Sequence, residues 1–171
     1  SMGSTDRFRN IAYVYIQMVF DAEKFGGGMP SVSFIVKGKK VFDPRDSTTA
    51  WSDNPALIIR DFLTDTVYGL KATSAEINDS TSAGGFASAA NVCDQTVTLS
   101  DGSSTETRYT ANGFTNMSAN GEGVLEALLS SCGGKMSYTN GKFNLFAGTG
   151  QTASLTITDD DLLQPIQVST K

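Results

Sequence analysis

The chain has 171 residues and a net charge of −5 at pH 7, since 18 acidic residues outnumber 13 lysines and arginines. A surface that tracks nucleic-acid phosphates needs clustered basic residues. The densest basic cluster is Lys37, Lys39 and Lys40, in a predicted turn, so the composition argues against binding nucleic acid through phosphates. Only 18% of residues are charged, and glycine is abundant, which favours turns and strands over long charged helices.

The length is that of one compact domain, or of a domain with a small annex. Residues 1–9 are expected to be a tag remnant, opening Ser1-Met2-Gly3, and a flexible N-terminus. Residues 10–171 are expected to form one domain, in which 70–115 is a candidate small sub-domain. No apolar run approaches the ~18 residues needed to span a bilayer.

The first predicted elements are strands. Residues 11–20 (IAYVYIQMVF) are β-prone, and both faces of such a strand are largely apolar, so the second face is expected to be covered by another element or another subunit. A glycine-rich loop follows over 25–30. Residues 31–36 are predicted to form a second strand, with a turn at 37–39 and a return strand over 40–42 that stops at Asp43-Pro44.

Three or four short helices are predicted next. The first starts after Asp53 or Asn54, with Pro55 at its first position, and ends near Tyr68-Gly69. Residues 74–93 read as a short helix capped by Ser74, a break at Gly84-Gly85 and a second helix from about 86 to 92. The third helix is capped by Asn120 and closed by Gly133-Gly134, with an apolar stripe of Val124, Leu125, Leu128, Leu129 and Cys132.

The remaining elements are hairpins and short strands. Strands over 96–99 and 107–114 are predicted around Asp101-Gly102, and a two-residue hairpin over 136–146 around Asn140-Gly141. Residues 154–158 and 166–168 are predicted strands, separated by a capped turn over 158–163. The fold class is therefore α+β, a mixed, mainly antiparallel β-sheet with three or four short helices.

The sequence offers little catalytic chemistry, and we expect no enzyme, no cofactor and no metal site. The absence of histidine removes Ser-His-Asp and Cys-His catalysis and the commonest metal ligand. The acidic cluster Asp159–Asp161 lacks the ligand spacing of a calcium loop and suits a helix N-terminus. Glu122 and Glu126 lie four apart on a helix, which is typical of a solvated face.

For a few residues the sequence leaves two structural interpretations open. Cys93 and Cys132 are expected to be reduced, buried thiols, with a disulfide between them as the alternative. Tyr13, Tyr15 and Trp51 are either ordinary packing residues or parts of a subunit interface, where aromatic residues are enriched. These three are the candidate interface residues.

Seven segments of the chain stand out together. They are NIAYVYIQMVFDAEKF, MPSVSFIVKGKKVFDPR and TTAWSDNPALIIRDFLTD, followed by ASAANVCDQ, RYTANGF, GEGVLEALLSSCGGKMSYTNGKFNLFAG and ITDDDLLQPIQV. In this order they resemble the central tail hub, or tip attachment, proteins of lambda-like long-tailed phages. The resemblance runs from about residue 10 to 168. AWSDNPAL followed by Arg60-Asp61 is its most specific combination, whereas Gly84-Gly85 and the glycines at 26–28 depart from the family pattern.

The resemblance implies a structural component of a phage tail tip. Such a chain would be part of a trimeric hub that closes the tail tube and takes part in host attachment and DNA ejection. Its partners would be other copies of the hub protein and other tail-tip proteins, with phage DNA passing without specific binding and no membrane contact by this chain. It would be assembled in the bacterial cytoplasm and reside in the virion. The alternatives are a virion carbohydrate- or receptor-binding module, and a cell-wall hydrolase domain.

Overall fold

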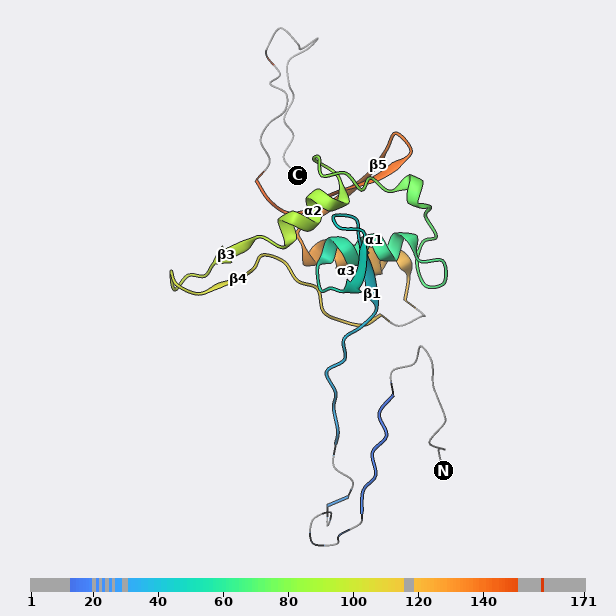
Figure 1. Cartoon of the computed structure of the whole chain (residues 1–171), viewed down its shortest axis with the longest axis vertical. Coiled ribbons are helices and arrows are strands. Elements are labelled where there is room, and N and C mark those ends of the chain that lie inside the picture. The colour runs from blue at the N-terminus through green and yellow to red at the C-terminus, as the bar shows by residue number, and fades with distance from the viewer. Residues whose placement is uncertain are drawn as a thin grey trace, which may run out of the picture. The chain divides into compact units, whose positions relative to one another are not determined.

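A computed structural model describes residues 13–19, 21, 23, 25, 27–28, 31–115, 119–150 and 158 (Figure 1). The chain divides into two units, residues 1–36 and 37–171. In the first unit the described residues form no helix or strand. The second unit holds all the described secondary structure, in the α+β class predicted from the sequence.

The described strands make three antiparallel pairs. β1 (Lys40–Asp43) pairs with β2 (Thr48–Trp51), β3 (Thr96–Thr98) with β4 (Thr105–Thr107), and β5 (Lys135–Thr139) with β6 (Lys142–Phe146). The β5–β6 hairpin turns at Asn140 and Gly141, whose φ angles of 53° and 75° are those that an Asn-Gly turn accepts. That prediction is confirmed.

The helices are α1 (Pro55–Thr64), the 3-10 helix η1 (Ser74–Glu76), α2 (Phe86–Cys93) and α3 (Gly121–Ser131). Asn54, one of the two predicted candidates, caps α1, and Asn120 caps α3 as predicted. The cap of η1 is Thr73 instead of Ser74, because Glu76 reaches back to the Thr73 backbone and hydroxyl in a capping box. α1 ends at Thr64, short of the predicted end near Tyr68-Gly69. The side chain of Asp65 accepts hydrogen bonds from the backbone N–H groups of Val67 and Tyr68, and these bonds turn the chain.

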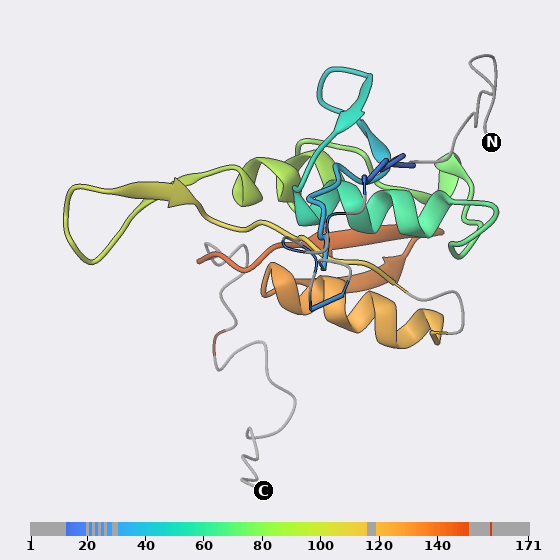
Figure 2. The same cartoon turned by 90° about the horizontal axis from the view of Figure 1, so that it is seen from below.

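α1 is the centre of the second unit. It contacts β1, α2 and α3, while β6 contacts α2 and η1. Figure 2 shows α1 and α3 with the β5–β6 hairpin beside them, and in both views the β3–β4 hairpin extends away from the helices. The core joins these elements through fully buried side chains, the largest of which are Phe86, Leu57, Ile59, Leu63 and Leu145.

The predicted N-terminal strands are not formed. Residues 13–19 and 31–36 have no regular structure, and their side chains are exposed. A strand persists only where its backbone groups find hydrogen-bond partners, and the described residues offer these segments no neighbouring strand. β1 pairs with β2 across a turn in which Ser47 has a φ of 60°, so the predicted pairing with 31–36 is wrong.

The β3–β4 hairpin also differs from its prediction. Its second strand covers 105–107, since Asp101 accepts from the N–H groups of Ser103 and Ser104 and reverses the chain early. Residues 108–114 then run without strand structure. The strands predicted over 154–158 and 166–168, and the turn between them, lie outside the described residues apart from Thr158.

Candidate assembly interface

The three candidate interface residues lie in two different units. Tyr13 and Tyr15 belong to the first unit and are 53% and 67% exposed. They alternate with Val14 and Ile16, which are exposed as well, so both faces of this segment are largely exposed among the described residues.

Trp51 ends β2 in the second unit and is 39% exposed. The Lys37 ammonium lies 4.9 Å from the centroid of its ring, a cation–π contact. Trp51 is thus held beside β1 by strand pairing and remains partly exposed.

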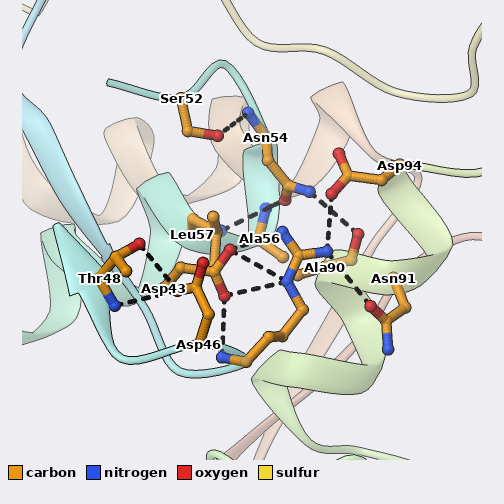
Figure 3. A network of polar contacts seen from close by, with 11 residues as sticks. Asp43, Asp46, Thr48, Ser52, Asn54, Ala56, Leu57, Ala90, Asn91 and Asp94 are labelled. Atoms are coloured by element: carbon orange, nitrogen blue, oxygen red, sulfur yellow. Dashed lines mark hydrogen bonds and ion pairs between the residues drawn. The ribbon is translucent and has the colours of Figure 1, made fainter. Parts of the chain in front are cut away.

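Asn54 fixes the start of α1. Its side-chain oxygen accepts from the N–H groups of Ala56 at 3.0 Å and Leu57 at 3.5 Å (Figure 3). Its side-chain nitrogen donates to the carbonyl oxygen of Ala90 in α2, at 2.9 Å. One buried amide therefore caps one helix and ties it to the next.

Arg45 joins the β1–β2 turn to α2. Its guanidinium pairs with Asp43 at 2.6 Å and Asp94 at 2.7 Å, and it donates to the side-chain oxygen of Asn91 at 3.2 Å. The hydrogen bonds from Arg45 hold the pKa of Asp43 below its usual value, against the opposing effect of burial. Figure 3 shows this network beside the Asn54 cap, at one end of α1.

An open, mainly apolar groove of about 1010 Å³ lies between α1 and α3. Its walls come from α1, from the loop 65–70, from the segment 110–115 and from α3. Phe114 is 99% exposed at its edge, and Val67, Tyr68 and Leu70 are exposed on the loop. We call this feature the α1–α3 groove. Large apolar side chains gathered round a concavity are typical of a surface that binds another protein.

Three charged side chains also line the α1–α3 groove. Lys39 pairs with Asp61 at 2.7 Å and also with Asp65. The hydrogen bond from Lys39, followed by those from the backbone N–H groups of Tyr68 and Val67, lowers the pKa of Asp65 well below the ordinary carboxyl range. Burial opposes the charge on Lys39, but the hydrogen bonds to the two aspartates outweigh it and raise the pKa of the ammonium.

Sequence reasoning missed the α1–α3 groove because its walls are contributed by segments that are far apart along the chain. Two local signals existed. Val67, Tyr68 and Leu70 form a short apolar run after the end of a helix, and Phe114 stands alone among small and polar residues. Neither signal places the loop opposite α3, which depends on tertiary packing.

The chemistry available in the described part of the chain is limited. No group of three or more histidine, cysteine, aspartate or glutamate residues there is arranged to hold a metal ion, and no helix there is long and apolar enough to span a bilayer. Glu122 and Glu126 are exposed on α3, and Asp159–Asp161 lie outside the described residues.

The chain matches no protein-family model and no curated protein.

Proposed function

We propose that this chain is a structural component of a phage tail tip, part of a trimeric hub that closes the tail tube and takes part in host attachment and DNA ejection. The observation that carries the proposal is the α1–α3 groove, with Phe114 and the 65–70 loop exposed on its rim. Such a surface supports function by packing against another protein and requires no reacting group.

The resemblance of the segments between about residues 10 and 168 to tail hub proteins supplies the identity of the assembly. The partners would be other copies of the hub protein and other tail-tip proteins, in the virion. The exposed apolar segments 13–19 and 31–36 support the same proposal, because apolar side chains that the described residues leave exposed can be covered by another chain.

Phage DNA would pass this protein without being held. The net charge of −5 makes the surface repel phosphates on average, and the lysine that lines the groove is paired with two aspartates. We expect no retardation of double-stranded DNA by the purified chain, even at ~20 mM salt, where phosphate contacts are strongest. A salt-sensitive complex would contradict this part of the proposal.

The groove variant Phe114→Asp tests the assembly role. Phe114 is nearly fully exposed, so the substitution should leave the folding of the chain unchanged while placing a charge in the contact. A phage carrying it should lyse its host after induction but release particles without complete tails, which electron microscopy would count.

Tyr138→Asp is the matched control. Tyr138 is 54% exposed on the β5–β6 hairpin and does not line the groove. Complete, infectious tails are expected with Tyr138→Asp. Normal tails in the Phe114→Asp phage would remove the groove from the proposal.

A further inference from the structure

Three Asn-Gly pairs occur in the chain, at Asn112-Gly113, Asn120-Gly121 and Asn140-Gly141. An asparagine followed by glycine readily loses its side-chain amide, because the glycine has no side chain to shield its backbone nitrogen. That nitrogen attacks the carbonyl carbon of the asparagine side chain and closes a five-membered ring. The three pairs are equivalent in sequence, and the structure separates them.

Two of the pairs are held by hydrogen-bonded structure. Asn120 caps α3, where its side-chain oxygen accepts from the N–H of Glu122 at 3.2 Å and its carbonyl oxygen accepts from the N–H of Val124 at 3.1 Å. Asn140 and Gly141 form the turn of the β5–β6 hairpin, with φ angles of 53° and 75°, and the paired strands flank this turn directly. Ring closure rotates the backbone after the asparagine, so the cap or the turn has to open first.

The third pair lies in a stretch without such restraints. Asn112 and Gly113 are exposed in segment 110–115, which contains no helix or strand. The N–H of Ala111 donates to the carbonyl oxygen of Asp53 at 2.8 Å and anchors the chain just before the pair. Among the described residues, neither Asn112 nor Gly113 takes part in a hydrogen bond. A Cβ placed on Gly113 meets nothing within 4 Å, so there is open space beside the attacking nitrogen.

We infer that Asn112 is a site of spontaneous deamidation in the folded, unassembled chain, with water as the only co-reactant. The Gly113 nitrogen loses its proton to a solvent base and bonds to the side-chain carbonyl carbon of Asn112, and the side-chain amide leaves as ammonia. Water then opens the cyclic imide at either of its carbonyl groups, which yields aspartate or isoaspartate. One water is consumed and one ammonia is released, and no atom changes its oxidation state.

The product replaces a neutral amide with a carboxylate in the α1–α3 groove. The groove walls include Asn112 and Phe114 and already hold the carboxylates of Asp61 and Asp65, which pair with Lys39. A new negative charge in an apolar contact opposes binding through its desolvation and through repulsion of like charges. This consequence rests on the proposed function, because it requires a partner in the groove, whereas the reaction at Asn112 does not.

The test follows the whole wild-type chain in mildly alkaline buffer by mass spectrometry. Each event raises the mass by about 1 Da, and chymotryptic cleavage after Phe114 separates Asn112 from Asn120. In the folded chain we expect Asn112 to react at least about five-fold faster than Asn120 or Asn140. In guanidinium chloride the cap and the turn are lost, so the three rates should come within about two-fold of one another.

Gly113→Ala is the matched variant. It keeps Asn112, and its methyl group fits the open space at this position but shields the attacking nitrogen. The Asn112 rate should fall severalfold, while the Asn140 rate stays as in the wild type. The comparison of the three sites in the wild type keeps the inference testable if the variant folds poorly. Equal rates at the three sites of the folded chain, or an Asn112 rate that Gly113→Ala leaves unchanged, would overturn the inference.

Discussion

The side-chain amide of Asn54 donates to the carbonyl oxygen of Ala90 at 2.9 Å, and this bond joins the first turn of α1 to the last turn of α2. The same amide caps α1, and its residue is only 2% exposed. Capping residues usually lie at the surface, where water can replace them. Because Asn54 is buried, water cannot replace the hydrogen bonds of its side chain, so the cap also determines how the two helices pack.

Asn54→Ala should therefore destabilise the chain by about 2 kcal/mol, of which about 1 is the lost cap and the rest the lost bond to α2. The loss is moderate because the Ala90 oxygen also accepts from the N–H of Asp94 at 3.0 Å and keeps that partner. Urea denaturation followed by circular dichroism measures it. Asn120→Ala is the control, since Asn120 caps α3 at an exposed position and should cost about 0.5–1 kcal/mol. Equal losses in the two variants would contradict the packing role of Asn54.

A second prediction concerns the buried ion pair of Arg60. Its guanidinium donates twice to the Asp79 carboxylate, at 2.7 and 2.6 Å, and lies 4.7 Å from the ring centroid of Phe42. Asp79→Asn leaves a buried cation without its counter-charge and should cost about 2 kcal/mol, a value reduced because Asp79 is partly exposed.

The double variant Arg60→Met/Asp79→Asn tests the cause of that loss. Methionine keeps most of the buried volume and removes the charge, so the double variant should recover at least half of the lost stability. Additive losses in the thermodynamic cycle would mean that the two side chains act independently.

The sequence predicted those parts of the fold that are specified by neighbouring residues. The caps at Asn54 and Asn120 and the turn at Asn140-Gly141 each depend on a few consecutive residues, and all three are confirmed. The predicted partner of β1 was wrong because alternation of apolar residues indicates a strand without indicating its partner. Segment 13–19 has strand-like composition but no partner within the described residues.

The candidate site was less accessible to sequence reasoning. Trp51 is 39% exposed on β2, whereas Phe114, Val67 and Leu70, which line the α1–α3 groove, were not among the candidate residues. An isolated exposed aromatic residue such as Phe114 has no neighbours in the sequence that reveal its surroundings. Contacts between α1 and α3 create the groove, and such contacts follow from the packing of the whole unit.

The lowered pKa of Asp65 predicts a loss of stability on acidification. A carboxylate whose pKa is lower in the folded chain than in the unfolded chain contributes stability above the ordinary carboxyl pKa of about 4. That contribution is lost as the pH falls from about 5 through the lowered pKa. The melting temperature should therefore decline over this range.

Asp65→Asn isolates this contribution, because the two backbone N–H groups of Val67 and Tyr68 bond one oxygen while Lys39 bonds the other. The amide keeps an oxygen for the backbone and loses the charge that Lys39 pairs with. The variant should show a flatter melting profile between pH 7 and about pH 3. Lys39→Gln should flatten it less, since it leaves the backbone hydrogen bonds to the carboxylate in place. If the melting temperature of Asp65→Asn fell with pH as steeply as that of the wild type, the Asp65 charge would not be the source of the acid sensitivity.

The last prediction separates assembly from folding at Tyr15. The ring is mostly exposed in the single chain, so Tyr15→Ser should change the melting temperature of the isolated chain by less than about 2 °C. If segment 13–19 packs between subunits, the same change should reduce the trimer fraction of a longer hub polypeptide, as measured by sedimentation. The reason is that truncating a buried aromatic side chain weakens the affinity between subunits several-fold. Tyr138→Ser, at a similarly exposed position on β5, should change neither quantity. A trimer that tolerates Tyr15→Ser as well as it tolerates Tyr138→Ser would place segment 13–19 outside the interface and leave the α1–α3 groove as the surface to test.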